Sequence, residues 1–215
     1  MPNIAWRTGT HLSKATFRRF AGTNVPMPWL IATIAGLSVL FAGPAQAQGD
    51  LWAQMREDRG LVVLMRHAIA PGGGDPAGFT LGDCSTQRNL SAEGRAQARA
   101  IGQQFARERV PIAAVRSSQW CRAADTARLL NLGIVKHTTA LNSVFTAPDQ
   151  VAMKRKKAAE RLINSHRGKP GVLVLVGHQA NIIDLTRIAP SSGGAVVVRT
   201  DAQGNIKVVG EIPAQ

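Results

Sequence analysis

The sequence predicts an α/β domain with three layers, in which a largely parallel sheet lies between two layers of helices. Strand-like apolar runs alternate along the chain with segments of helical periodicity, which is the pattern of such domains. Two runs, 61–65 and 171–176, are apolar throughout, as expected of strands buried on both faces of a parallel sheet. Once the first 47 residues are set aside, the remaining length fits one domain with one core.

The first 47 residues are typical of an export signal. They contain four basic and no acidic residues, then an apolar run over 29–43, and they end on Ala45-Gln46-Ala47. The apolar run is shorter than the roughly 20 residues that span a bilayer, which favours a cleaved signal over a permanent anchor. We therefore expect a signal peptide over 1–47, a domain over 48–215 and a periplasmic or secreted protein; Met27 is an alternative start.

The first half of the domain begins with a short helix predicted over 48–59, before the strand 61–65. The loop that follows, over 70–83, is rich in Gly, Pro and Asp, and its length is typical of functional loops near strand ends. Ser91 stands at a helix start as an N-cap residue, and Pro111 closes that helix.

The second half continues the alternation of strands and helices. The predicted elements are a strand over 112–116, a helix over 119–130, a strand over 133–135, a helix over 149–166, the strand 171–176, a helix over 179–188 and a hairpin of 195–199 with 206–210. The basic run Lys154-Arg155-Lys156-Lys157 is interpreted as a solvated helix face, with attraction to anionic lipid or polysaccharide as the alternative.

The charge of the domain predicts an anionic partner. Four of the 26 basic residues precede residue 48, so 22 remain against 13 acidic residues, a net charge of +9. Such an excess suits phosphate esters, nucleic acid or an anionic membrane surface. The chain has no Tyr and few other aromatics, which disfavours a base-stacking surface. We expect a phosphorylated small molecule or envelope glycan as partner and no nucleic acid, and leave peripheral contact with an anionic membrane surface open.

Each of the two most apolar strands ends in a histidine. Arg66 and His67 follow one strand, and Gly177-His178 closes the other. Ligands of open α/β sheets bind at the carboxyl ends of strands, which is where both histidines fall. Arg122 lies in the first turn of a helix, whose amino end favours anions.

These residue types suit phosphoryl transfer. A neutral imidazole can take a phosphoryl group as nucleophile, guanidinium groups bind two phosphate oxygens at once, and a second imidazole can stabilise the group in transit. A metal site formed by the two histidines and a carboxylate lacks paired-ligand spacing, and neighbouring arginines repel cations. We predict no metal and no cofactor.

Four blocks in chain order resemble the histidine phosphatase (phosphoglycerate-mutase-like) superfamily. They are Arg66-His67-Ala68, where the family has Arg-His-Gly; Asn89 to Gly94, which is similar to its Leu-Thr-x-x-Gly helix start; Ser118 to Ala127, with Arg, Ala, Thr and Ala in register; and Gly177-His178. The resemblance covers about 61–188 and implies the phosphoglycerate-mutase-like form of the three-layer fold. The stretches 82–85 and 141–145 are also similar to an exported bacterial branch associated with removing phosphate from the lipopolysaccharide core.

The resemblance assigns roles to individual residues. It implies that His67 accepts the phosphoryl group, that Arg66 and Arg122 hold the phosphate and that His178 completes the pocket. By the same resemblance, Arg88, Asn89 and Gln179 are candidate substrate-binding residues.

The chain departs from the family pattern where a proton donor is expected. Asn142 stands where many members carry a glutamate, and Gln179 follows His178 where another branch has an aspartate. Asp75 or Asp83 on the long loop is a candidate donor, or the substrate has a good leaving group. Trp120 is a further departure, a large aromatic in place of the family's leucine.

The two cysteines, Cys84 and Cys121, are by themselves compatible with a disulfide or with two buried thiols. The resemblance puts both on loops beside one pocket and so favours a bridge between them.

The sequence therefore predicts a periplasmic phosphatase that hydrolyses phosphate monoesters through a phospho-histidine, with envelope sugar phosphates as candidate substrates. The alternative is a catalytically weak or inactive phosphate-binding protein that keeps the arginines and histidines but has lost the acid at Asn142.

Overall fold

The computed structural model describes residues 44–215, so most of the predicted signal peptide lies outside the described residues. The helices are α1 (Pro44–Glu57), α2 (Ala92–Arg107), α3 (Cys121–Leu129), α4 (Asp149–Asn164) and α5 (Gln179–Thr186), with short 3-10 helices η1 (Cys84–Thr86) and η2 (Thr139–Leu141). The strands are β1 (Val62–Arg66), β2 (Ile112–Ser117), β3 (Val135–His137), β4 (Val172–Gly177), β5 (Ala195–Thr200) and β6 (Ile206–Ile212).

Within the described part of the chain, these strands form a six-stranded sheet in the order β3-β2-β4-β1-β5-β6. The pairs β3–β2, β2–β4 and β4–β1 are parallel. The pairs β1–β5 and β5–β6 are antiparallel, which gives the predicted C-terminal hairpin. The predicted three-layer α/β fold with a largely parallel sheet is confirmed.

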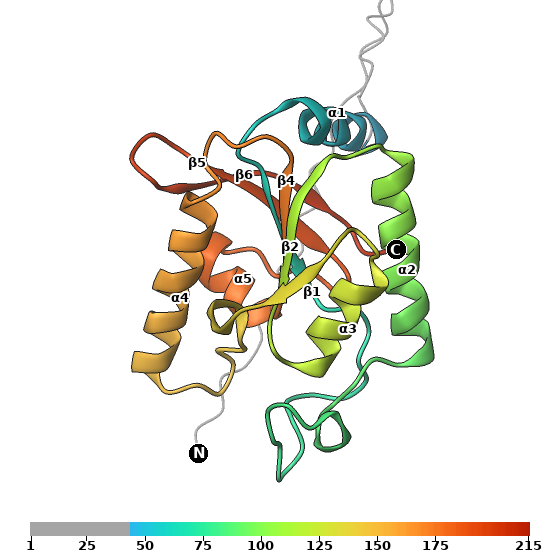
Figure 1. Cartoon of the computed structure of the whole chain (residues 1–215), viewed down its shortest axis with the longest axis vertical. Helices are drawn as coiled ribbons and strands as arrows, with labels where there is room; N and C mark the ends of the chain where they lie inside the picture. The colour runs from blue at the N-terminus through green and yellow to red at the C-terminus, as the bar shows by residue number, and fades with distance from the viewer. Residues whose placement is uncertain (1–43) are drawn as a thin grey trace, which may run out of the picture. The chain divides into compact units, whose positions relative to one another are not determined.

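Figure 1 shows helices on both faces of the sheet, and the alternation of side chains along β1 explains this arrangement. Val63 and Met65 belong to the core cluster that also contains residues of α1, α2 and α3. Val62 and Leu64 belong to the second cluster, together with Ile163 of α4 and Ile182 of α5. Because successive side chains of a strand point to opposite faces, each face needs its own helix layer, and the uninterrupted apolar sequence follows from this.

Helix α2 shows how local signals set the bounds of an element. Ser91 is its N-cap, and its side chain accepts a hydrogen bond from Gly94 N, as predicted. The helix ends at Arg107, earlier than the expected end at Pro111. The reason is that Arg109 adopts a left-handed conformation (φ 53°), which turns the chain toward β2 before the proline is reached.

No helix among residues 44–215 combines the length and apolar character that crossing a membrane requires.

Helices α2 and α3 pack closely at Gly102. A Cβ atom built on Gly102 would overlap the backbone carbonyl of Leu130, just after α3. Backbone cannot move aside as a flexible side chain can, so only glycine allows this approach.

We expect Gly102→Ala to lower the free energy of unfolding by about 2 kcal/mol or more, because overpacking a tight contact forces the helices apart. Urea denaturation of the variant and the wild type measures the change. Gly73→Ala is the matched control: a Cβ there meets no atom within 4 Å, so its midpoint should hardly move. Equal midpoints for the two variants would contradict the close packing.

Candidate active site

Three neighbouring parallel strands bring the site together at their carboxyl ends. The register pairs Arg66 of β1 with Gly177 of β4, so His67 and His178 follow directly on adjacent strands. His67 N donates to Gly177 O at 2.9 Å, and Ser118 N, just after β2, donates to Val176 O at 2.9 Å. The imidazole rings of His67 and His178 lie edge to face, with centroids 5.6 Å apart.

The ring of His67 is fixed by its own backbone neighbour. Its Nδ1 lies 2.8 Å from the carbonyl oxygen of Ala68. A carbonyl can only accept, so we assign the proton to Nδ1, which leaves the lone pair on Nε2. The side chain is 3% exposed. Position and tautomer are those of an imidazole prepared for nucleophilic attack through Nε2.

Burial keeps this imidazole neutral. The pKa of His67 is lowered to about 3, chiefly by loss of water. The hydrogen bond to Ala68 opposes this shift, and the charges of Arg122, Arg88 and Arg66 add to it. His178 is also buried, and desolvation followed by the charge of its neighbours holds its pKa well below the usual value. Both rings are therefore neutral at physiological pH.

His178 is held by Ser118. Its Nε2 lies 2.9 Å from Ser118 Oγ, while its Nδ1 is buried with no hydrogen-bond partner in the protein. Ser118 also approaches Asn142 Oδ1 at 3.3 Å and accepts from Trp120 N at 3.2 Å. The second histidine is thus oriented at one nitrogen, with the other left unbonded.

Three arginines supply the positive charge. Arg122, in the first turn of α3, is 3% exposed, and Arg66 donates through Nη1 to Pro190 O at 3.2 Å. The Nε groups of Arg66 and Arg122 are buried without a partner. Arg88 donates through Nε to Gly74 O at 2.8 Å and through Nη1 to Ala70 O.

Unpaired buried donors are costly unless a ligand accepts from them. Of the four buried side-chain polar atoms without a partner in the described residues, three belong to this site: the donors Arg66 Nε and Arg122 Nε, and His178 Nδ1, whose role depends on the tautomer. Donor groups and positive charge together suit an anion with several oxygens.

Asp75 faces the arginines from the glycine-rich loop. Its carboxylate accepts from Arg122 Nη1 at 2.5 Å and from Trp120 Nε1 at 2.9 Å. Partial burial works to raise the pKa of Asp75, but these two hydrogen bonds and the charges of Arg122 and Arg88 outweigh it and hold the pKa below its usual value. Trp120, which stands where the family has a leucine, is therefore a hydrogen-bond donor to this carboxylate.

A disulfide joins the loop to the start of α3. Cys84 and Cys121 are bonded, with Cα atoms 5.7 Å apart, as the family resemblance implied. Gln87 adds a second tether, because its Oε1 accepts from Cys121 N at 2.9 Å. The loop that carries Asp75 and Arg88 is thereby fastened next to Arg122.

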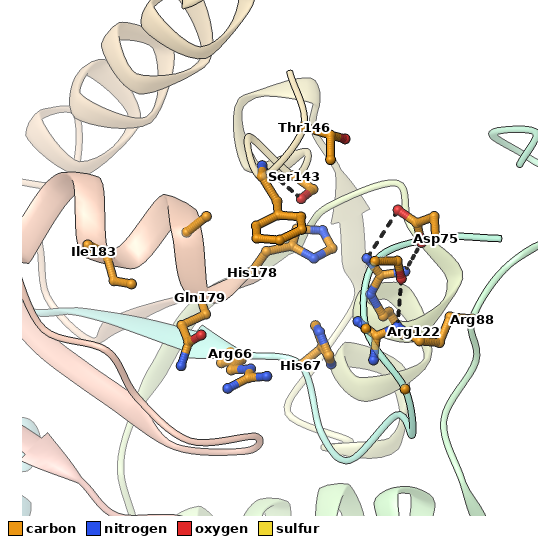
Figure 2. Close-up of a pocket in the computed structure, with 15 residues that line it drawn as sticks. Arg66, His67, Asp75, Arg88, Arg122, Ser143, Thr146, His178, Gln179 and Ile183 are labelled. Atoms are coloured by element: carbon orange, nitrogen blue, oxygen red, sulfur yellow. Dashed lines mark hydrogen bonds and ion pairs between the residues drawn. The ribbon is translucent and has the colours of Figure 1, made fainter. Parts of the chain in front are cut away.

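The two histidines, the three arginines and Asp75 line a cavity of about 310 Å³. Its lining residues are Arg66, His67, Gly72, Gly73, Gly74, Asp75, Arg88, Arg122, Ser143, Phe145, Thr146, His178, Gln179, Ala180 and Ile183. Figure 2 shows Asp75, Arg88 and Arg122 on one side of the two histidines, and Gln179 and Ile183 of α5 on the other. One side of the cavity therefore carries two arginines and Asp75, and the other carries neutral side chains of α5 with Arg66 beside Gln179.

Most of the predicted site residues meet in this cavity. His67, His178, Arg66, Arg122, Arg88, Gln179 and Asp75 line it. Asn89 and Asp83 do not: Asn89 Nδ2 donates to Cys84 O, and Asp83 is the exposed N-cap of η1, accepting from Ser85. Both stabilise the loop beside the disulfide.

Asn142 is a buried structural residue. Its Oδ1 accepts from Gln119 N at 3.0 Å, its Nδ2 donates to Gln119 Oε1 at 2.9 Å, and its carbonyl accepts from Asn181. It does not line the cavity. Asn142 therefore connects Gln119, just before α3, through its side chain with α5 through its main-chain carbonyl.

Sequence reasoning missed the segment that closes the other end of the cavity. Ser143, Phe145 and Thr146 line it, and Phe145 is 72% exposed. Arg155 donates to Ser143 O at 2.6 Å, so one member of the basic run in α4 braces this segment instead of lying in solvent. The exposure of Phe145 cannot be read from the sequence, and nothing in the basic run distinguished Arg155 from its neighbours.

The residues that the structure describes contain no group of three or more His, Cys, Asp or Glu side chains placed to bind a metal ion.

The three-layer fold and its strand-end histidines set among arginines define a class of protein: phosphatases that work without a metal through a histidine. Residues 62–142 match the family model of the histidine phosphatase superfamily (branch 1). The match covers less than half of the chain, and the strand-end histidines, the arginines and the fold described above agree with it.

Solved structures of phosphatases share the fold. The protein histidine phosphatase SixA, in complex with tungstate, is 17% identical with a TM-score of 0.51, over 71% of this chain and 96% of that one. A phosphoserine phosphatase variant from Entamoeba histolytica, in complex with phosphoserine, is 15% identical with a TM-score of 0.51, over 70% and 95%. A mycobacterial glucosyl-3-phosphoglycerate phosphatase is 18% identical with a TM-score of 0.51, over 71% and 97%. No curated protein sequence matches the chain significantly.

The low pKa of His67 predicts how stability depends on pH. The unfolded chain binds a proton at this histidine below about pH 6.5, whereas the folded protein does so only near pH 3. The free energy of unfolding contributed by this group is therefore present above pH 6.5 and lost as the pH falls toward 3. We expect His67→Asn to make stability less dependent on pH between about 6.5 and 4, measured by urea denaturation. Removal of the exposed His137 (His137→Asn) is the control; a change of slope as large as that of His67→Asn would contradict the assignment.

Proposed function

We propose that the protein is a periplasmic phosphatase that hydrolyses phosphate monoesters through a phospho-histidine intermediate, with envelope sugar phosphates as substrates. One observation carries the catalytic part: His67 is buried, neutral and fixed through Nδ1, so that Nε2 is left to attack within a cavity lined by three arginines.

The charge of the cavity matches the proposed substrate. Arg66, Arg88 and Arg122 together with Asp75 give a net charge of +2, with both imidazoles neutral. A phosphate monoester near neutral pH carries up to two negative charges. Guanidinium groups in a partly desolvated site bind such a dianion and its transition state through charge-assisted hydrogen bonds.

The proposed reaction uses each group once. The arginines hold the peripheral oxygens, His67 Nε2 attacks phosphorus, and the Nδ1–H bond to Ala68 O stabilises the positive charge that develops on the ring. Water then hydrolyses the phospho-histidine. His178 is neutral and oriented by Ser118, and its ring lies against that of His67, where it can contact the phosphoryl group during transfer.

The far end of the cavity supports a sugar as the remainder of the substrate. Ser143, Thr146 and Gln179 offer hydroxyl and amide groups, while Phe145 and Ile183 offer apolar surface. A sugar presents hydroxyl groups at its edge and C–H groups on its faces, which is the same mixture. The similar structures include a protein histidine phosphatase, a phosphoserine phosphatase and a glucosyl-3-phosphoglycerate phosphatase; the substrates named in the last two are phosphate monoesters, which supports this class without choosing a member.

Three features support the proposed location. The predicted signal peptide precedes the domain, the Cys84–Cys121 disulfide suits an oxidising compartment, and the positive charge suits the anionic envelope.

We expect the purified domain to hydrolyse an aryl phosphate, and His67→Ala to lower kcat at least about 10³-fold, because removing a nucleophile abolishes the covalent route. If the reaction with a radiolabelled aryl phosphate is stopped during turnover, an acid-labile, base-stable phosphoprotein should be trapped in the wild type only.

The alternative phosphate-binding protein makes a different prediction. Wild-type protein that binds inorganic phosphate in calorimetry, yet shows neither turnover nor a trapped phosphoprotein with any monoester, would refute the phosphatase. Arg122→Ala should abolish phosphate binding under either hypothesis, and so confirms that the cavity is the site measured.

Phe145 provides a test of the sugar end. We expect Phe145→Ala to raise KM for hexose phosphates about fivefold, equivalent to about 1 kcal/mol of lost aromatic contact, and to leave KM for methyl phosphate unchanged. Ile134→Ala removes a side chain that is 86% exposed and does not line the cavity, so it serves as the control. Equal KM changes for both substrates would exclude Phe145 from substrate choice.

A further inference from the structure

We propose that Asp75 is the general acid and base of this site, donating the proton to the leaving oxygen and taking it back from water. The proposal rests on the proposed phosphatase function and adds to it the one group that His67 and the arginines cannot supply, since none of them offers a proton to an alkoxide at neutral pH.

Asp75 is the only carboxylate that lines the cavity in the described part of the chain. Its Oδ1 lies 2.5 Å from Arg122 Nη1. Asp75 is therefore in contact with an arginine that we propose to bind the phosphate. Asp83, on the same loop, bonds to Ser85 outside the cavity, and Asn142 is an amide buried within the protein. The position for a proton donor is therefore filled from the glycine-rich loop.

Several contacts hold this carboxylate at the cavity wall. Trp120 donates to Asp75 Oδ2, and the indole is stacked on Phe79 with ring centroids 5.1 Å apart. Arg88 binds the carbonyls of Gly74 and Ala70, which fixes the loop on both sides of the glycines. So many restraints on one side chain are expected where its position matters for the reaction.

Substrate binding changes the surroundings of Asp75. In the free protein no other anion competes with Asp75 for Arg122, and the pKa of Asp75 lies below its usual value. A phosphoryl group that takes up Arg122 weakens this ion pair and brings two negative charges close, and both effects favour the protonated carboxyl group. Asp75 thus takes up its proton together with the substrate, from water or from the monoanionic ester.

The two half-reactions balance. In the first, the P–N bond to His67 Nε2 forms, the ester P–O bond breaks with its electron pair on oxygen, and that oxygen takes the Asp75 proton to leave as an alcohol. In the second, a water oxygen attacks phosphorus, the P–N electron pair returns to His67, and the Asp75 carboxylate takes the water proton. Ester and water give alcohol and inorganic phosphate, with Asp75 and His67 restored.

Dependence on the leaving group tests the assignment. The experiment measures kcat/KM of wild type and Asp75→Asn with glycerol phosphate, whose alkoxide must be protonated, and with p-nitrophenyl phosphate, whose phenolate leaves unaided. We expect Asp75→Asn to slow the alkyl ester about 10²–10³-fold and the aryl ester only a few-fold. A purely structural role would lower both rates alike.

Two further variants make the result specific. Asp83→Asn changes the charge of the same loop outside the cavity and should leave both rates unchanged. Trp120→Phe keeps an aromatic ring against Phe79 but removes the N–H donor to Asp75, so it should slow the alkyl ester selectively and more mildly. It also tests the proposal if Asp75→Asn fails to fold.

Equal slowing of both esters, or faster turnover of both on release of Arg122, would overturn the role of Asp75 while leaving the phosphatase intact. Absence of turnover and of a trapped phospho-histidine in the wild type would instead overturn the proposed function, and this inference with it.

Discussion

The parallel pairing of β1 with β4 is the constraint on which the site depends. Its register places Arg66 opposite Gly177, and the residues that follow on both strands are histidines. The hydrogen bond from His67 N to Gly177 O continues the ladder one step beyond the strand, which sets the two rings edge to face. A slip of one residue would reverse both faces of β1 and also separate the histidines, so the requirements of the core and of the site coincide. The arginines, the disulfide and the loop are arranged around this fixed pair.

Concentrating positive charge at this edge carries an electrostatic cost that the protein limits in two ways. Both imidazoles are kept neutral by burial, so they add nothing to the repulsion among Arg66, Arg88 and Arg122. Asp75 then compensates part of the charge through its ion pair with Arg122. The remaining imbalance, together with the unbonded Nε groups of two arginines, makes the site destabilising for the fold and favourable for a dianion. Stability given up here is recovered when an anionic ligand binds, as expected of a preorganised site.

How far the sequence could predict this arrangement depended on the kind of signal. Apolar strands ending in His67 and His178 follow from periodicity and strand polarity, and the block from Ser118 placed Arg122. The loop residues were different. Asp75 and Asp83 were equal candidates because loop conformation depends on tertiary contacts: the hydrogen bond with Trp120 turns one inward, while η1 uses the other as its cap. Arg155 lay in a uniform basic run, and only its contact with Ser143 distinguishes it. The signal peptide stays a prediction, since residues 1–43 are outside the described part.

The bond between Cys84 and Cys121 makes one wall of the cavity sensitive to the redox state of its surroundings. It fastens the loop of Asp75 and Arg88 to the helix that begins beside Arg122, and so adds a covalent link to the hydrogen bonds that hold this wall. Thiols are kept reduced in some compartments and oxidised in others. Under reducing conditions the loop is held by its hydrogen bonds and by the Asp75–Arg122 ion pair alone, so the precision of the charged wall is coupled to an oxidation that takes place outside the cavity.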